Sequence, residues 1–368
     1  MQRLTSGLDW RRLDWPLVAA ALSLAGVGLA AIYSAALIGT DTTTATGYFE
    51  RQAAWLVVGV VAALLALAID YQLLAAVGPW LLAAGVVLLG LVLIVGVEIN
   101  GAKAWFRFGS VALQPAELAK VGLLLTLAGQ LGRRRGGPLS WPELGRIALI
   151  VGLPVILILR QPDLGTVLVF VALTGGIILW SGLSVGRLLL LGGLSLGLVA
   201  AVWHTDVLAD YQKNRVLVLF DTKVDPRGVG YNLNQSLIAV RSGGARGQGW
   251  LQGTQTHLRF LPEAQTDFIF AAFCEEWGLL GAVVVLLLYA VMFWRMWGLI
   301  LLAESETGRL IIVGAGALLL FHTLLNIGMV LGMLPVAGLP LPFISYGGSN
   351  LVTTCALLGL VLNVGARR

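Results

Sequence analysis

The chain has 368 residues, of which 58% are hydrophobic and 12% are charged. Soluble domains are about half apolar and about a quarter charged, so this balance excludes an ordinary soluble protein and favours one that lies in lipid. The net charge of +5 does not predict nucleic-acid binding, because the basic residues occupy short loops between apolar runs. Both cysteines, Cys274 and Cys355, lie inside apolar segments, which argues against a disulfide framework or a cysteine-based metal site.

Uncharged apolar stretches recur along the whole chain, and each approaches the roughly 20 residues that a helix needs to cross a bilayer. The first run, 16–38, follows basic residues as a signal peptide does, but its 23 residues exceed a usual signal h-region, so it is interpreted as a retained helix. The sequence therefore predicts an all-α integral membrane protein with about ten transmembrane helices, a single polytopic domain over 1–368. The predicted helices are 16–38, 52–69, 73–97, 110–130, 145–160, 164–186, 187–203, 267–296, 310–333 and 343–365.

The distribution of basic residues supports ten helices with both termini in the cytoplasm. With the N-terminus inside, twelve basic residues fall in cytoplasmic segments and four in the short outer loops, which is the asymmetry of the positive-inside rule. The inner set is Arg3, Arg11, Arg12, Arg133, Arg134, Arg135, Arg146, Arg187, Arg295, Arg309, Arg367 and Arg368. The outer set is Arg51, Lys103, Arg107 and Arg160.

The one long connection is the polar segment 204–266, a predicted extracytoplasmic loop of 63 residues between the seventh and eighth helices. Connections of that length are usually functional. The segment contains the glycine cluster Ser242-Gly243-Gly244 and seven basic residues. These are Lys213, Arg215, Lys223, Arg227, Arg241, Arg246 and Arg259.

Charged residues near the bilayer centre cost about 3 kcal/mol or more, so they pair with one another or line a polar cavity. Glu117 and Lys120 lie three residues apart on one face of the fourth predicted helix, where they form either a structural ion pair or part of an anionic-substrate cavity. Asp163 follows Pro162 at an outer turn, where it either caps the next helix or belongs to a substrate site.

Two further pairs of polar residues fall within predicted helices. Glu275 and Glu276 point about 100° apart, so they cannot both face lipid at low cost. His322 and Asn326 lie four residues apart, a spacing more often used for interhelical hydrogen bonds than for metal binding.

Asp267 is the most informative acidic residue, because it lies at the outer mouth of the eighth predicted helix, beside the basic loop. The helix dipole alone would account for an aspartate at this position. Partial desolvation there would also raise the pKa of the carboxyl group toward that of a useful general base.

Five motifs follow one another along the chain. They are Asn100 to Trp105 (NGAKAW), Gln114 to Lys120 (QPAELAK), Gln161 to Thr166 (QPDLGT), Leu261 to Phe270 (LPEAQTDFIF) and Pro342 to Ser349 (PFISYGGS). Over nearly the whole chain they resemble the SEDS family of shape, elongation, division and sporulation proteins. Segments 253–263 and 334–340 look more like the elongation branch of that family than its division branch.

Two positions depart from the pattern of that family. Gln265 stands where the family usually has histidine, which moves the assignment of a base toward Asp267. Arg241 stands where a glycine usually precedes Ser242-Gly243-Gly244.

The resemblance implies a peptidoglycan glycosyltransferase that polymerises lipid II, the undecaprenyl-pyrophosphate-linked disaccharide peptide, at the outer face of the bacterial cytoplasmic membrane. It also implies a class B penicillin-binding protein as the transpeptidase partner. The chain itself is expected to contact membrane lipid and not to bind nucleic acid. Transfer to a sugar hydroxyl needs one base, whereas the pyrophosphate leaving group needs cations rather than an acid. The cofactor stays open, with a divalent cation, magnesium or manganese, as one alternative.

Asp267 is the residue expected to act as the base. The candidate substrate-binding residues are Arg51, Lys103, Glu117, Lys120, Asp163, Arg215 and Arg246. A lipid II flippase and a non-catalytic scaffold for the penicillin-binding protein are the alternative functions. A transporter would place its acids at the membrane midplane, whereas Asp267 and Asp163 are predicted at the outer surface.

Overall fold

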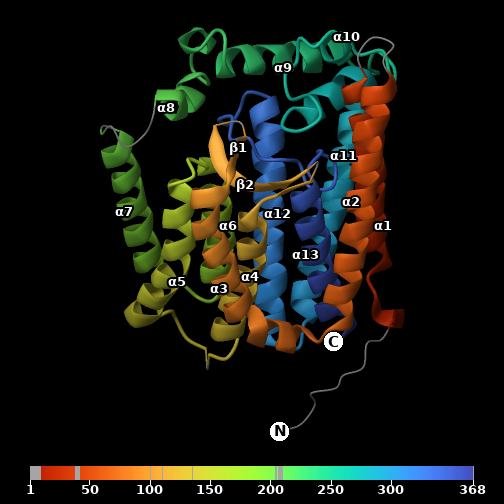
Figure 1. The fold of residues 1–368 in the computed structure, drawn as a ribbon. Coiled ribbons are helices and arrows are strands. Elements are labelled where there is room, and N and C mark those ends of the chain that lie inside the picture. Colours follow the sequence, from red (N-terminus) through yellow and green to blue (C-terminus); the bar gives the residue numbers. More distant parts are fainter. Residues whose placement is uncertain are drawn as a thin grey trace.

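The structure is a computed structural model that describes residues 10–37, 42–99, 101–109, 111–134, 136–203, 205 and 210–367. In this described part, ten helices stand together in a bundle, and each overlaps one of the ten predicted helices (Figure 1). They are α1 (Trp15–Ala36), α2 (Thr42–Ala68), α3 (Tyr71–Val95), α4 (Pro115–Leu131), α5 (Trp141–Leu159), α6 (Leu164–Trp180), α7 (Val185–Trp203), α11 (Ile269–Leu302), α12 (Glu306–Val330) and α13 (Gly348–Ala366).

Seven of these helices are long and apolar enough to cross a membrane among the described residues, namely α1, α2, α3, α5, α11, α12 and α13. α4 and α6 have 17 residues each and stand within the bundle, whereas α7 stands at its outer edge (Figure 1). The prediction of a helical, multi-pass membrane protein is therefore confirmed.

The long connection between α7 and α11 is folded, and it lies across one end of the bundle (Figure 1). It contains α8 (Asp210–Leu217), the 3-10 helix η2 (Thr222–Val224), α9 (Val229–Gly243) and α10 (Thr254–His257). α9 is fastened to the bundle where Ser236 Oγ donates to the Val330 carbonyl oxygen of α12 at 2.9 Å. We call this end of the bundle the α9 end.

The prediction of an all-α chain was incomplete, because three short strands follow α3. β1 (Val97–Ile99), β2 (Ala102–Phe108) and β3 (Val111–Leu113) form an antiparallel sheet in the order β1-β2-β3. Their valine and aromatic side chains favour strands. Gly101, with a φ of +82°, turns the chain between β1 and β2, a conformation that glycine adopts without steric cost.

Several predicted helix boundaries differ from the structure, and two of them were wrong for clear local reasons. α2 begins at Thr42 rather than at 52, because polar residues continue the helix beyond its apolar run. α4 begins at Pro115 rather than at 110, since proline suits the first turn of a helix and the preceding residues pair as β3.

α11 differs more from its prediction, 267–296, because Gly278 breaks it with a φ of +62° and a ψ of −162°. The loop 244–249 packs into the break. The backbone N–H groups of Leu279 and Leu280 donate to the carbonyls of Gly244 and Ala245 at 2.9 and 3.1 Å. Backbone groups released by the break are thus satisfied by the loop rather than by the helix.

Glycines allow the helices of the bundle to pack closely. A Cβ atom at Gly78, Gly85, Gly122 or Gly129 would lie 2.5 to 2.9 Å from atoms of the facing helix in the α3–α4 pair. Contacts below 3.0 Å would force those helices apart, so small residues let the backbones meet, as is usual in membrane helix pairs.

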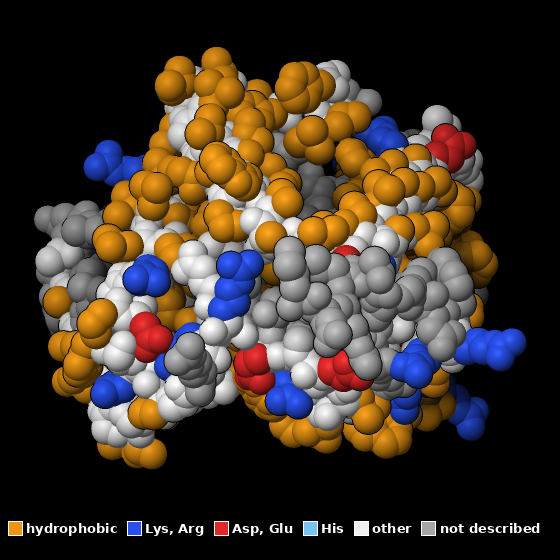
Figure 2. Space-filling model, turned by 90° about the horizontal axis from the view of Figure 1, so that it is seen from below, with side chains coloured by type: hydrophobic (Ala, Val, Ile, Leu, Met, Phe, Trp, Pro, Cys, Tyr) orange, Lys and Arg blue, Asp and Glu red, His pale blue; other side chains and the backbone are white. Residues whose placement is uncertain are grey.

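The end of the bundle opposite to α9 holds the start of α1 and the end of α13, and basic side chains spread over its face (Figure 2). Ion pairs join helix ends there. Arg295 Nη2 lies 2.7 Å from Asp14 Oδ2, and Arg134 Nε lies 2.7 Å from Glu143 Oε1. This is the end that the charge distribution predicts to face the cytoplasm.

Candidate active site

Asp267 lies in the turn that leads into α11, outside the membrane-spanning helices. Phe268, not Asp267, is the N-cap residue of α11, and the cap has no side-chain hydrogen bond. Among the described residues, no donor forms a hydrogen bond with the Asp267 carboxylate. The side chain is therefore not used for capping, and both of its oxygen atoms are free to act on a substrate.

The backbone around Asp267 is held by buried polar side chains. Asn326 Nδ2 of α12 donates to the carbonyl oxygens of Asp267 at 2.9 Å and of Leu339 at 2.8 Å. Ser345 Oγ donates to the Thr266 carbonyl oxygen at 2.7 Å. The loop 338–347 and α12 together fix the turn on both sides of the aspartate.

α2 and α12 support the same loop through further contacts. Gln52 Nε2 of α2 donates to the Ser345 carbonyl oxygen at 3.1 Å, and His322 Nδ1 of α12 lies 3.2 Å from the Pro340 carbonyl oxygen. His322 and Asn326 were expected to bond between helices, but their partners are loop carbonyls. A buried amide or imidazole stabilises irregular backbone inside a membrane protein by pairing such groups.

Burial raises the pKa of Asp267 to about 6. The negative charges of Glu263 and Asp163 act in the same direction, whereas the charge of Arg215 lowers the pKa. A carboxyl group with this pKa is mostly ionised at neutral pH and is still basic enough to take a proton from a reacting hydroxyl.

Asp163 caps α6, which was one of the two alternatives that the sequence left open for this residue. Its Oδ1 accepts from the Thr166 backbone N–H at 3.0 Å, and its Oδ2 accepts from Thr166 Oγ1 at 2.7 Å and from Gln114 Nε2 at 3.1 Å. These three bonds hold Asp163 in a structural position, and its charge still acts on Asp267.

Arg215 comes to the site from α8. Its guanidinium carbon lies 5.8 Å from the centroid of the Tyr211 ring, and the Tyr211 hydroxyl donates to the Pro162 carbonyl oxygen at 3.4 Å. The buried Nε atom of Arg215 has no hydrogen-bond partner in the described structure. An unpaired guanidinium N–H beside a basic carboxylate is suited to a phosphate oxygen of a ligand.

Arg51 lies against aromatic rings near the start of α2. Its guanidinium carbon is 5.7 Å from the centroid of the Tyr48 ring, which meets the Tyr346 ring edge to face at 4.9 Å. Since Tyr346 N–H donates to the Gln265 carbonyl oxygen at 2.9 Å, this cluster borders the segment that carries Asp267.

Two predicted site residues lie elsewhere in the structure. Lys103 Nζ donates to the Ile94 carbonyl oxygen at 3.1 Å on an exposed surface. Arg246 is exposed on the loop that fills the break of α11 at Gly278. Gly278 is 11 residues after Asp267, a helical rise of roughly 16 Å. Neither Lys103 nor Arg246 has a contact that brings its side chain to Asp267.

Glu117 and Lys120 form the predicted ion pair, with Lys120 Nζ 2.8 Å from Glu117 Oε1. Their side chains are 8% and 3% exposed, so neither is open to a substrate in this structure. His322 and Thr353 lie beside Glu117. His322 also contacts the Pro340 carbonyl oxygen, so it lies between the ion pair and the loop 338–347.

The described residues contain no group of three acidic, histidine or cysteine side chains close enough to hold a metal ion. Magnesium usually binds through one or two carboxylates, several waters and the phosphates of a substrate. Asp267 and Glu263 have carboxylate oxygens of that kind, but a cation held by them would need further ligands from water or a phosphate-bearing molecule.

Glu263 and Ser345 were not predicted as site residues. Both stand inside motifs of the sequence, in Leu261 to Phe270 and in Pro342 to Ser349, and those motifs were the available signal. Gln52 gave no signal, because a bond from a side chain to the backbone of a distant segment leaves no pattern in the sequence.

Comparisons with known proteins agree with this fold. A solved structure of a peptidoglycan synthase complex, described as coordinating polymerization and crosslinking, contains a chain that matches with a TM-score of 0.82 at 35% identity, covering 97% of this chain and 98% of that one. The crystal structure of the rod shape determining protein RodA from Thermus thermophilus matches with a TM-score of 0.72 at 32% identity, covering 97% of each chain.

Curated relatives match over a similar length. The peptidoglycan glycosyltransferase MrdB of Escherichia coli strain K12 is 39% identical over 344 residues, 92% of this chain and 90% of that protein. A probable peptidoglycan glycosyltransferase FtsW from Alkalilimnicola ehrlichii is 39% identical over 368 residues, 98% of this chain and 91% of that protein. The profile of the cell cycle proteins FtsW, RodA and SpoVE matches residues 15–368. The chain therefore belongs to the FtsW, RodA and SpoVE family of cell cycle proteins.

Proposed function

We propose that this protein is a peptidoglycan glycosyltransferase that joins the lipid-linked disaccharide peptide, lipid II, into glycan strands. The observation that carries the proposal is the carboxylate of Asp267, which accepts no hydrogen bond from the described residues and lies where burial raises its pKa to about 6. It lies beside the unpaired guanidinium of Arg215, in a chain whose relatives are named peptidoglycan glycosyltransferases.

The proposed reaction uses Asp267 as a general base. The acceptor hydroxyl attacks the anomeric carbon of the donor sugar, and the bond from that carbon to the phosphate oxygen breaks. The lipid pyrophosphate leaves with the electron pair of that bond, and Asp267 takes the proton of the hydroxyl. Direct displacement of this kind inverts the anomeric centre.

The leaving group needs positive charge rather than a proton, and Arg215 is placed to supply it. A guanidinium binds phosphate oxygens in a planar, two-point geometry. Its stabilisation grows as negative charge develops on the pyrophosphate, so the contact lowers the barrier as well as the dissociation constant. A glycosidase would instead need two carboxylates facing each other across the bond, whereas Asp163 is engaged as the cap of α6.

The setting of the reaction is proposed to be the outer face of the bacterial cytoplasmic membrane. Arg215 belongs to α8, which lies at the α9 end (Figure 1), and its charge acts on Asp267. The opposite end carries the basic loops that the positive-inside rule assigns to the cytoplasm (Figure 2). Both termini then lie in the cytoplasm. A class B penicillin-binding protein is the proposed partner, because a similar chain is part of a peptidoglycan synthase complex.

A role in cell elongation is proposed because the sequence resembles the elongation branch and the fold matches a rod shape determining protein. Cell division is the second candidate, since a probable FtsW relative is as similar in identity as MrdB. Depletion of the protein tests the choice, because loss of rod shape indicates elongation and filamentation indicates division.

Purified protein given lipid II in detergent tests the activity itself. A polymerase makes glycan chains that a gel resolves. A flippase would instead move labelled lipid II across a liposome membrane without making polymer, and a scaffold would do neither. Transport of lipid II with no polymer, even with the partner protein present, would contradict the proposal.

Replacing Arg215 is expected to weaken both lipid II binding and turnover in a graded series. Arg215→Ala removes a charge-assisted contact, which corresponds to about a 10- to 100-fold loss of lipid II affinity. Arg215→Lys should fall between Arg215→Ala and wild type, because lysine keeps the charge but not the two-point geometry. Arg51→Ala is compared in the same titration of initial rate against lipid II concentration.

Arg227→Ala is the control for this series, because Arg227 is an exposed arginine of the same long connection. It should bind and polymerise lipid II as wild type does. Unchanged turnover at saturating lipid II in the Arg215 and Arg51 variants would place the pyrophosphate elsewhere and leave these arginines with lipid headgroups as partners.

A further inference from the structure

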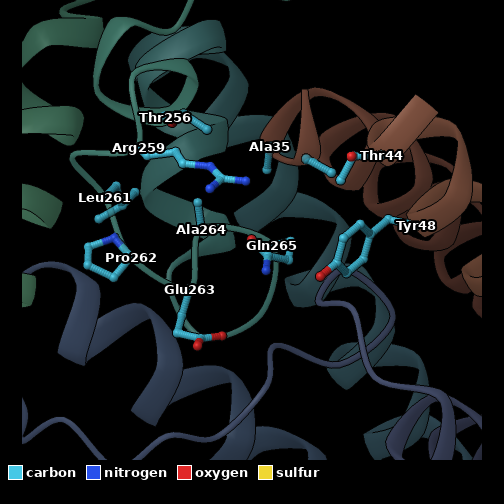
Figure 3. A pocket seen from close by; sticks show the side chains of 11 residues that line it. Ala35, Thr44, Tyr48, Thr256, Arg259, Leu261, Pro262, Glu263, Ala264 and Gln265 are labelled. Atoms are coloured by element: carbon cyan, nitrogen blue, oxygen red, sulfur yellow. The ribbon is translucent and has the colours of Figure 1, made fainter. Parts of the chain in front are cut away.

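A cavity of about 290 Å³ lies beside the Asp267 turn, between the ends of α1 and α2 and the segment 254–265 (Figure 3). Its apolar lining includes Ala35 of α1 and Leu261, and its polar lining includes Arg259, Tyr48 and Gln265. Nothing in the proposed transfer step uses these three polar side chains.

Arg259 is the cation of this cavity. No carboxylate of the described residues pairs with its guanidinium, which reaches into the space between the loop and α2 (Figure 3). Its backbone has a φ of +59°, a left-handed conformation that is strained for a residue with a side chain. Backbone strain of this kind persists where the surrounding structure imposes it, commonly at ligand sites.

Gln265 and Tyr48 present further groups to the same space. In the described structure, neither the Gln265 amide nor the Tyr48 hydroxyl forms a hydrogen bond. Both are held from behind, since the Gln265 carbonyl oxygen accepts from Tyr346 N–H and the Tyr48 ring packs against the Tyr346 ring. An amide both donates and accepts, which matches the N–H and C=O groups of a peptide.

Glu263 sets the charge that the cavity accepts. It lines the cavity, it has a φ of +50°, and its charge acts on Asp267. A pyrophosphate next to this carboxylate would be repelled unless a cation lay between the two groups. A single carboxylate on a peptide would pair with Arg259, while an N–H group of the same peptide could donate to Glu263.

We propose that this cavity binds the terminal carboxylate of the peptide carried by lipid II, with Arg259 as its counterion. The proposal rests on the proposed function, because the peptide belongs to that substrate. Glu263 borders both the cavity and Asp267, so a peptide held there places its sugar toward the general base. The cavity thereby selects substrates that carry a peptide with a free carboxylate.

A comparison of two ligands binding to two proteins tests the role of Arg259 directly. Fluorescent lipid II with a free terminal carboxylate, and the same lipid II with that carboxylate converted to an amide, are titrated against nanodiscs of the wild-type protein and of Arg259→Ala. Wild type should bind the acid about tenfold more tightly than the amide, and the variant should bind the two ligands equally.

Equal discrimination between acid and amide by both proteins would overturn the assignment, and so would wild type binding both ligands alike. A loss of the same size for both ligands in Arg259→Ala would also overturn it, because the arginine would then hold the pyrophosphate or the sugar. Arg259→Lys should keep part of the discrimination, and Arg227→Ala should keep all of it. Polymer formation by wild type is measured in the same preparation. A failure of the proposed function then appears as absence of polymer, whereas a failure of the carboxylate site appears only in the binding comparison.

Discussion

Asp267→Ala is expected to lower the rate of glycan polymerisation by about 10²- to 10⁴-fold, which is the contribution typical of a general base. The carboxylate is unpaired, whereas the backbone of the turn is held by Asn326 and Ser345. The variant should therefore fold, insert into the membrane and bind its partner as wild type does. A loss larger than this range would indicate that Asp267 also holds a divalent cation.

The controls separate loss of the base from loss of structure. Asp267→Asn keeps the size of the side chain and should be as inactive as the alanine variant. Asp221→Ala removes an exposed aspartate of the long connection, which caps only η2, and should keep full activity. Polymer formation is measured from initial rates with purified lipid II, and near-normal polymer from Asp267→Ala would end the assignment of the base.

Removing one member of the Glu117–Lys120 pair is expected to destabilise the protein by about 3–5 kcal/mol, because the remaining charge is left buried without a partner. Glu117→Gln and Lys120→Met should each have this effect. The double variant should be more stable than the sum of the two single losses predicts. The free energy of unfolding is measured by denaturant titration in detergent micelles.

An exposed pair with the same spacing provides the matched control. Arg309 Nη1 lies 3.3 Å from Glu306 Oε2 three residues apart on α12, and the two side chains are 39% and 40% exposed. Surface pairs are worth about 0–1 kcal/mol, so breaking this pair should change the free energy of unfolding little. Additive losses in the buried pair would show that Glu117 and Lys120 do not stabilise each other.

The helices of the bundle could be predicted because each apolar run is long enough to leave few alternatives in a membrane. The interruption at Gly278 could not, since the loop 244–249 that stabilises it lies far away in the sequence. The strands at 97–113 were missed for a different reason. They are too short for a periodic pattern to stand out from the apolar run of α3.

The candidate site was predicted in part. Asp267 and Arg215 could be selected because an acidic residue at a helix mouth and a cationic residue in a polar connection are informative by residue type alone. The structure places their charges close enough to interact. Lys103 and Arg246 were selected by the same reasoning and lie elsewhere, because the path of a loop is not written in its own residues. Arg259 was one of seven basic residues, and only the folded cavity distinguishes it.

The pH dependence of polymerisation tests the role of Asp267 most directly. The base must be ionised, so kcat/KM should fall about tenfold for each pH unit below an apparent pKa of about 6 and level off above it. Because Glu263 raises this pKa and Arg215 lowers it, Glu263→Gln should move the acid limb to lower pH and Arg215→Ala should move it to higher pH. A rate that stays constant between pH 5 and pH 7, or a limb that moves in neither variant, would contradict general-base catalysis by Asp267.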